Sequence, residues 1–471
     1  MRSFQSTGFL ILLLTIIAAS TIFVGCGSSG GTATVATSLS DPATCGPPQG
    51  AFSHIYVTVT DVEISQSATA GANDSSWVDL TPKLKNNPVQ VDLLGVANQC
   101  FLATLGSTGI PAGNYQQIRV ILASNGVGVS NNKCGPGAAN CVMLTNDPSQ
   151  TPFALQLSSE ARTGIKIPSG QIAGGQFTVK AGDKKDFNID FNACASIVTQ
   201  GNGQYRLKPV LHAGEVQLQS TSTAISGIVV NAANGLPITG GTTVIALEQM
   251  DAGKVDRVIM ETVAASDGSF SFCPVAAGSY DVVVSAVDGS GNVFAASVIT
   301  GVQPGDNLAN IPVTSAGAAA SLQGQVTTST GTGATSADVE LAALQQISEI
   351  INNTPTTVMI TTPLASQSAA TANFATQSLG SCPVNTDCMS YTLALPASTP
   401  GVGAFKANQN QQITTLPILG SANYTLDATT FVPGAATQTG DCSPSEMQSG
   451  GIAVNTGQTV QVPAIQFSGC Q

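Results

Sequence analysis

Apolar residues recur mainly at every second position of this chain, and that period constrains the fold more than any other feature. Ile55, Val57 and Val59 alternate with polar residues, and Phe187 and Ile189 repeat the spacing. A period of two places successive side chains on opposite faces of a strand. No segment before residue 219 keeps a helical period over three turns, and scattered glycine and proline mark many turns. The chain is therefore predicted to be all-β.

The alternation also locates finer features. After Asp61 the apolar set moves to Val62 and Ile64, and this one-residue slip predicts a β-bulge or bend at Asp61. Glycine and asparagine at 201–203 predict a hairpin, and the turn at 181–183 is expected to join two further strands. Residues 336–351 are rich in Ala, Leu and Glu and would also suit a helix, but a strand followed by one helical turn is the favoured interpretation.

The N-terminus is basic at Arg2, apolar from residue 9 to 24, and then reaches Gly25-Cys26 and a Gly/Ser stretch. This layout resembles a bacterial lipoprotein signal, although Phe23 stands where such signals usually carry Leu. The resemblance implies export, lipidation of Cys26 and a lipid anchor in the cell envelope. By resemblance to lipoproteins of two-membrane bacteria, Gly27 after the cysteine, in place of Asp, implies the outer membrane.

Simple secretion and an uncleaved membrane anchor are the alternatives to lipidation. A membrane-spanning helix needs about 20 apolar residues, and the apolar run is shorter and broken by Thr15, Ser20 and Thr21. No later run in the sequence is long enough to span a membrane. The membrane is therefore an expected partner through the lipid alone.

Charged residues make up only 9% of the chain, against about 25% in an average protein. The net charge is −12, so nothing neutralises phosphates and nucleic acid is excluded as a partner. With 471 residues, about three domains are expected. The predicted divisions are a signal peptide at 1–25, a lipidated Cys and tether at 26–33, a β-rich domain at 34–219, a β-sandwich at 224–315 and a diverged β-sandwich at 316–471.

Removing Cys26 from the eleven cysteines leaves an even ten, which fits disulfides in an oxidising compartment. No C-x-x-C pair exists and histidines number two, so neither a metal site nor a cofactor is predicted. Short spacing predicts that Cys134 pairs with Cys141 and Cys382 with Cys388, and a shared domain suggests Cys442 with Cys470. The sequence leaves open the pairing of four cysteines: Cys45, Cys100, Cys194 and Cys273.

Sequence landmarks in the first half of the chain are shared with a known family. They lie in order at 41–42, 52–64, 91–94, 111–119, 165–170, 190–198 and 205–210. Together they cover nearly all of 34–219 and resemble the bacterial lipoprotein family catalogued as domain of unknown function 4382. The resemblance brings no established activity, so it implies no functional residues.

Residues 224–315 resemble the carboxypeptidase-regulatory-like, transthyretin-like sandwich, also grouped with Cna B-type repeats. The resemblance rests on the strands at 225–230, 244–247 and 280–284 and on the Asp267-Gly268 turn. Some Cna B-type repeats carry a Lys–Asn isopeptide bond, but Lys254, the only lysine here, lies in a polar turn-like stretch, which argues against one. Residues 322–326 and 337–344 echo these strands, so 316–471 is expected to be a diverged copy. The stretch 315–320 between the two copies is small or polar and is expected to carry no strand.

Few residues suggest catalysis. The chain has no G-x-S-x-G motif, and His54 and His212 fit ordinary strand ends better than catalytic bases. Two carboxylate pairs could serve glycoside hydrolysis, but a solvated strand face is the simpler interpretation; the pairs are Asp61 with Glu63 and Asp186 with Asp190. Asp267-Gly268 and Asp288-Gly289 indicate turns, because neither lies in a calcium-loop pattern. No catalytic residue is therefore assigned.

Trp77, the sole tryptophan, follows a polar loop at 73–76 and is the weak candidate for a glycan-stacking platform, with capping of a core as the other interpretation. The sequence therefore predicts tandem antiparallel β-sandwich modules (Ig-like or transthyretin-like) behind a lipoprotein signal peptide. The leading function is a non-enzymatic structural or interaction role in the cell envelope, with an envelope protein or a glycan as partner. A carbohydrate-binding surface lipoprotein and a secreted hydrolase are the alternatives.

Overall fold

The computed structural model describes ten stretches of the chain. They are 31–40, 51–95, 103–157, 164–207, 211–216, 224–364, 376–377, 386–405, 413–431 and 442–470, with short gaps at 72, 192, 200–203, 274, 276, 331–337, 352, 443 and 445. The signal peptide, Cys26 and most of the tether lie outside these residues, as do Cys45, Cys100 and Cys382. The cleavage and lipidation at Cys26 and the pairing of these cysteines remain predictions.

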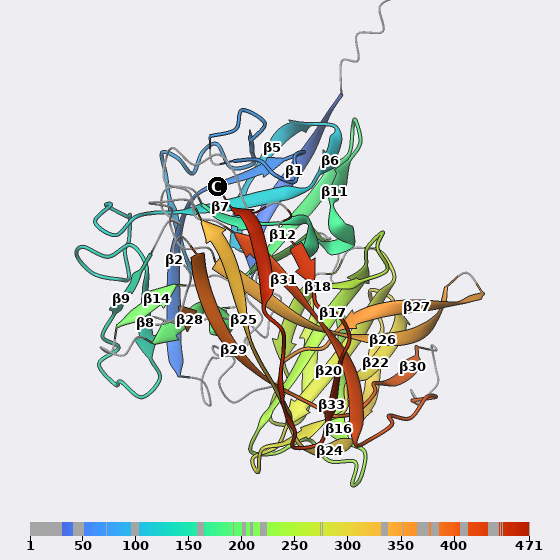
Figure 1. The fold of residues 1–471 in the computed structure, drawn as a ribbon. Coiled ribbons are helices and arrows are strands. Elements are labelled where there is room, and N and C mark those ends of the chain that lie inside the picture. The colour runs from blue at the N-terminus through green and yellow to red at the C-terminus, as the bar shows by residue number, and fades with distance from the viewer. Residues whose placement is uncertain are drawn as a thin grey trace, which may run out of the picture.

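The described chain is built of strands in several separate sheets, which confirms the all-β prediction (Figure 1). Its helical elements are one turn each: α1 (Ala193–Ser196), η2 (Ser169–Gln171) and η3 (Ala173–Gly175). Most strand pairs are antiparallel, while others such as β1 with β12 and β16 with β23 are parallel. Three main hydrophobic cores divide the strands into a first segment (32–216), a second segment (225–313) and a third segment (320–470).

The first segment holds a four-stranded sheet ordered β15-β12-β1-β5, a nine-stranded sheet centred on β2, and the pair β6–β11. Its strands are β1 (Thr32–Ser40), β2 (Phe52–Ser65), β3 (Val78–Asp79), β4 (Val89–Asp92), β5 (Ala103–Pro111), β6 (Gly113–Tyr115), β7 (Gln117–Leu122), β8 (Cys141–Leu144), β9 (Phe153–Gln156), β10 (Ile165–Ile167), β11 (Phe177–Val179), β12 (Lys184–Phe191), β13 (Ile197–Thr199), β14 (Tyr205–Leu207) and β15 (Leu211–Val216).

The sequence signals are confirmed at two places in this segment. The pairing of β2 with β7 shifts register between Val59 and Asp61, which is the expected bulge, and it keeps both Val59 and Val62 buried. β13 and β14 pair antiparallel around residues 200–203, as the hairpin signal indicated. The turn at 181–183 joins β11 to β12, but these strands pair with β6 and β1 instead of each other. Here the turn connects two sheets.

The second segment packs the sheet β19-β16-β23 against a sheet containing β18-β17-β20-β22. Its strands are β16 (Ile225–Asn231), β17 (Thr242–Met250), β18 (Asp256–Val263), β19 (Ser269–Phe272), β20 (Tyr280–Val287), β21 (Asn292–Phe294), β22 (Ser297–Val302) and β23 (Asn307–Val313), and β24 (Ser315–Ala318) follows it. Every residue of β20 is buried. Such a strand is covered on both faces.

The third segment repeats this pairing order. Its strands are β25 (Ala320–Thr330), β26 (Asp338–Ile351), β27 (Thr354–Thr361), β28 (Thr376–Gln377), β29 (Thr386–Leu395), β30 (Gly401–Ala404), β31 (Ser421–Phe431), β32 (Glu446–Gln448), β33 (Ile452–Asn455), β34 (Thr459–Gln461) and β35 (Ile465–Cys470). β25 pairs like β16, antiparallel to one strand and parallel to the last ones, and β26 pairs like β17. This repetition supports the interpretation of a diverged copy.

Two expectations about the third segment are corrected. The helical turn expected before residue 351 is wrong, because β26 is a strand over its whole length, paired with β27 on one side and β31 on the other. Two partner strands outweigh the modest helix propensity of Ala, Leu and Glu. The stretch 315–320 was expected to carry no strand, but Ser315–Ala318 forms β24 and pairs with β21. The domain boundary near 315 stays a prediction.

The second and third segments are in close contact. β30 adds to the β22 edge of the second segment's larger sheet, and Met359 of β27 forms an isolated bridge with Val255 beside the opposite edge. In Figure 1 the orange hairpin β26–β27 crosses the yellow-green strands of the second segment, and Ile347 and Val358 of the hairpin pack on Val283 of β20. The third segment therefore extends one edge of that sheet, contacts the residue before the other edge strand and packs on the outer face.

Candidate functional site

Trp77, Asp61 and Glu63 from the sequence analysis come together on the β2–β3–β7 surface of the first segment. Lys85 Nζ lies 3.0 Å from Asp61 Oδ2 and 2.8 Å from Asp79 Oδ2, and 3.7 Å from Glu63 Oε1. Glu63 also pairs with Arg119 of β7. This is a mixed-charge network and not the solvated carboxylate face that the sequence suggested, since Asp61 is buried.

Burial and the neighbouring carboxylates control the ionisation of Asp61. Burial raises its pKa to about 7, the hydrogen bond with Lys85 opposes this shift, and the nearby Asp79 and Glu63 add to it. The Asp61 Oδ1 atom accepts hydrogen bonds from the Val62 backbone at 2.9 Å and from Thr81 Oγ1 at 3.2 Å. These bonds hold the bulge in shape, which is a structural use of the carboxylate.

Trp77 has less freedom than a stacking platform requires. The Arg119 guanidinium lies over the indole ring, with its Cζ 4.3 Å from the ring centroid, and the indole N–H donates to the Gly71 carbonyl at 2.7 Å. Trp77 is half-buried. One face of the ring is thus occupied by a cation–π contact. The arrangement fits a cap over the charged network better than an open sugar site.

His54 is paired with a carboxylate. Its Nδ1 lies 2.7 Å from Asp92 Oδ2, and its ring stacks on Tyr56 at a centroid distance of 5.5 Å. Burial raises the pKa of Tyr56, and the charge of Asp92 adds to that shift. A His–Asp pair can orient a general base, but nucleophilic catalysis also needs a hydroxyl or thiol bonded to the imidazole. Within the described residues, Asp92 is the hydrogen-bond partner found for the His54 ring.

His212 lies beside Asp190, because β12 and β15 pair these two residues directly. Ser40 Oγ donates to Asp190 Oδ1 at 3.3 Å and accepts from Asn188 Nδ2 at 2.7 Å. Ser40, Asp190 and His212 are all buried. In a catalytic triad the serine hydroxyl bonds to the imidazole, whereas here it bonds to the carboxylate. The trio is a buried polar network in which the serine hydroxyl donates to the carboxylate.

Asp190 corrects the prediction that Asp186 and Asp190 share a solvated face. Asp186 is half-buried, but Asp190 has no exposed surface. Burial raises the pKa of Asp190 to about 8; the charge of Glu261 adds to the shift, while His212, the Glu261 backbone N–H and Ser40 oppose it. Glu261 belongs to β18, so this network lies at the contact between the first and second segments.

Sequence reasoning missed Arg257. From β18 its Nε lies 3.0 Å from Asp251 Oδ2, its Nη1 2.6 Å from Asp427 Oδ2 and its Nη2 2.7 Å from Glu446 Oε1. A Cβ on Gly170 of the first segment would lie 2.8 Å from Glu446 Oε2. All three segments therefore meet at this guanidinium.

The charges at Arg257 act on one another. Burial alone would lower the pKa of Arg257, but the carboxylates of Asp427 and Glu446 raise it above its ordinary value. Burial, together with Glu446, raises the pKa of Asp427 to about 6 despite the guanidinium. The sequence offered no signal for this network, since its members stand 170 and 189 residues apart.

Cys134 and Cys141 form a disulfide with a Cα–Cα distance of 5.5 Å, the pairing that their spacing predicted. Cys273, Cys388 and Cys442 are disulfide-bonded as well. The side chains of Cys194, Cys382 and Cys470 lie outside the described residues, so the pairings Cys382–Cys388 and Cys442–Cys470 remain predictions.

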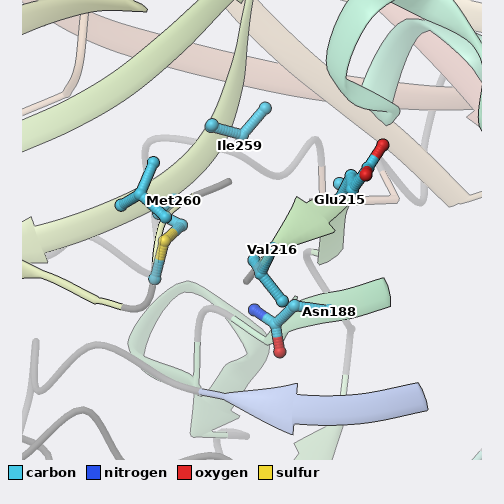
Figure 2. A pocket seen from close by; sticks show the side chains of 7 residues that line it. Asn188, Glu215, Val216, Ile259 and Met260 are labelled. Carbon is cyan, nitrogen blue, oxygen red and sulfur yellow. The ribbon is translucent and has the colours of Figure 1, made fainter. Parts of the chain in front are cut away.

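A small pocket of about 220 Å³ lies between the first and second segments. Figure 2 shows Glu215 and Val216, from β15, across the pocket from Ile259 and Met260 of β18. That volume includes open solvent, and the enclosed space is only about 10 Å³, roughly the room that one water molecule needs, so the pocket is far smaller than a ligand site. Across the described residues, no group of three or more His, Cys, Asp or Glu side chains has the arrangement of a metal site. Nor does the described chain contain a helix with the length and apolar character of a membrane span.

The solved structures that this chain matches include bacterial proteins of low sequence identity and low TM-score. The Bacillus anthracis TIE protein is 9% identical with a TM-score of 0.16, and the match covers 93% of this chain and 51% of that one. A DUF3823 family protein from Bacteroides uniformis is 10% identical, with a TM-score of 0.15 and coverage of 50% and 99%. GBS52, the minor pilin of Streptococcus agalactiae, is 11% identical, with a TM-score of 0.14 and coverage of 53% and 97%. The chain thus spans about half the length of the TIE protein.

At these TM-scores the structural likeness carries no further argument. Sequence comparison with curated proteins gives no match. The resemblance of residues 224–315 to a carboxypeptidase-regulatory-like module remains a prediction. Residues 32–209 match the family model described as Domain of unknown function (DUF4382), which confirms the resemblance that the landmarks between residues 41 and 210 indicated.

Proposed function

We propose that the chain is a lipid-anchored cell-envelope protein with a structural, interaction role and no enzymatic activity. Its three β segments act as one rigid body, which the Gly/Ser tether holds away from the membrane. The observation that carries this proposal is the fusion of the segments: β30 pairs with β22, Met359 bridges to Val255, and Arg257 binds carboxylates of the third segment.

Rigidity is the property that these contacts supply. Domains joined by flexible linkers usually move relative to one another, whereas a shared sheet and a buried ion network fix their orientation. Ala173 of the first segment packs against the second core, so the first segment is joined to the same body. A stiff body of this kind suits a spacer or a presenting surface in the envelope.

A non-enzymatic role is supported by the state of the candidate residues. The His54 ring is paired with Asp92, and the serine beside Asp190 and His212 bonds to the carboxylate. Trp77 is covered on one face by Arg119, so no described contact favours the glycan-binding alternative over an envelope-protein partner.

Anchoring is tested by replacing the cysteine that is expected to carry lipid. Cys26→Ser should move the protein from the membrane fraction to the soluble fraction or leave it unprocessed, because the sulfur that accepts the diacylglycerol is gone. The native protein should resist extraction by salt, since several acyl chains together anchor stably where one does not. Fractionation and mass spectrometry of the N-terminal peptide measure both outcomes.

Ser28→Ala, two positions further along, is the matched control and should leave the location unchanged. An unmodified mature N-terminus at any position other than Cys26 would overturn the anchoring proposal. The choice of outer membrane is tested in the same experiment by separating the two membranes on a density gradient.

A further inference from the structure

The contact between the hairpin β26–β27 and the second segment encloses a set of acidic side chains. Glu248 of β17, Asp256 of β18 and Asp281 of β20 are buried, with 0%, 2% and 6% of their surface exposed. Glu349 of β26 is half-buried and raises the pKa of both aspartates through its charge. The four carboxyl groups therefore come from both partners of one interface.

Direct contacts connect these carboxyl groups to the hairpin and to one another. The Thr361 backbone N–H of β27 donates to Glu248 Oε2 at 3.1 Å, and Thr361 Oγ1 donates to the Asp256 carbonyl at 2.9 Å. Gly301 N–H donates to Asp281 Oδ1 at 3.2 Å, and the side chains of Asp256 and Asp281 are within hydrogen-bonding reach of each other. A hydrogen bond between two carboxyl groups requires a proton on one of them.

No described lysine or arginine neutralises this set. On the strands and turns packed here the cations are Lys254 and Arg257, and Arg257 is engaged with Asp251, Asp427 and Glu446. The other charged neighbours, Asp251 and Glu261, are acidic and add repulsion. One oxygen each of Glu248, Asp256 and Asp281 also lacks a hydrogen-bond partner in the described structure.

An ionised carboxylate that is buried without a cation is strongly unfavourable, so such a group takes up a proton instead. Burial raises the pKa of Asp256 to about 7 and, with the charge of Asp256, raises the pKa values of Glu248 and Asp281 well above their ordinary range. Burial also raises the pKa of Glu349.

We propose that the contact between hairpin β26–β27 and the second segment is an acid-stabilised latch: protonated Glu248, Asp256 and Asp281 hold it closed, and their ionisation loosens it. The apolar contacts of Ile347, Val358 and Ile360 hold the hairpin in place at every pH, and the carboxyl groups add the pH dependence.

The direction of the pH dependence follows from the pKa values of these carboxyl groups in the closed state. Each group is easier to protonate in the closed interface than in an exposed chain, so the closed state is favoured most below about pH 4. That advantage is lost as the pH rises through the folded pKa, which for Asp256 is about 7. The latch is therefore closed at pH 5 and weakened at pH 8.

Hydrogen exchange of the full mature chain, made soluble by Cys26→Ser, measures this opening segment by segment. Protection factors in β26–β27 should fall about 100-fold between pH 5 and pH 8 from the ionisation of Asp256 alone. Strand β25, in the other sheet of the third segment, should change less. Unchanged protection of the hairpin between the two pH values would overturn the proposal.

A variant with Glu248→Gln, Asp256→Asn and Asp281→Asn carries neutral groups of the same shape and should keep the hairpin equally protected at both pH values. Asp288→Asn, in the turn between β20 and β21, is the control that should keep the wild-type pH dependence. If the triple variant does not fold, Asp256→Asn alone gives the test, with a smaller pH difference expected. Millimolar calcium is then added to the wild-type protein at pH 8. If calcium restores the hairpin protection seen at pH 5, and a chelator removes it again, the proton latch is overturned in favour of a cation site.

Discussion

Arg257→Ala should destabilise the protein by about 3–5 kcal/mol, the cost typical of removing one partner from a buried ion pair. The reason is the environment left behind. Without the guanidinium, the buried Asp427 and its neighbours Asp251 and Glu446 would repel one another with no compensating cation. Urea unfolding of the soluble Cys26→Ser form, with the variant in the same background, measures the loss of free energy.

Two comparison variants separate the network from a general effect of lost charge. Lys185→Ala removes a partner of Glu215 from a more exposed ion pair and should cost less than about 1 kcal/mol. Arg257→Lys keeps the positive charge, but its single ammonium group replaces three nitrogens that each bind a different carboxylate. Its loss of unfolding free energy should therefore lie between the losses for Lys185→Ala and Arg257→Ala. A loss below about 1 kcal/mol for Arg257→Ala would mean that the three segments do not depend on this residue.

Asp190→Asn should remove about 3–4 kcal/mol of the difference in stability between pH 5 and pH 8. The folded pKa of Asp190 is about 8 because of burial. A group whose pKa is higher in the folded than in the unfolded protein contributes its full stabilisation below the pKa of the unfolded chain. That contribution is lost as the pH rises through the folded pKa, here about 8. Asparagine is a neutral isostere, so the variant should be less sensitive to pH across this window. Urea unfolding at the two pH values gives the comparison.

Asp186→Asn, four residues earlier on β12, is the matched control, since Asp186 is half-buried. It should leave the pH difference of the wild type in place. If Asp190→Asn keeps the full pH difference, Asp190 is not the group that loses its proton in this range.

The strands of the first segment were readable from the sequence because their alternation is local. Ile55, Val57 and Val59 mark one face of β2, and the change of phase after Asp61 is itself the signature of the bulge. The turn at 181–183 does join two strands as expected, but a turn signal does not say which strands pair, and β11 and β12 pair with β6 and β1 and not with each other.

The candidate sites were less accessible to sequence reasoning. Asp61 lies two residues from Glu63, and Asp190 lies four residues from Asp186. Solvated strands and buried strands can both show this spacing. Their burial depends on segments far away in the chain, such as β15 for Asp190. Arg257 had no signal at all, since Asp427 and Glu446 reach it only through folding. Distant segments also decide the structure of β26, because its pairing with β27 and β31 makes it a strand where its composition would also suit a helix.

The central claim is that the three β segments form one rigid body, and scanning calorimetry of the soluble Cys26→Ser chain tests it most directly. One cooperative transition, with equal calorimetric and van't Hoff enthalpies, is the result expected for segments joined by β30, the β26–β27 hairpin and Arg257. Arg257→Ala should lower the temperature of that transition or split it. Two or three separable transitions in the unsubstituted chain at pH 5 would contradict the claim and describe independent modules instead.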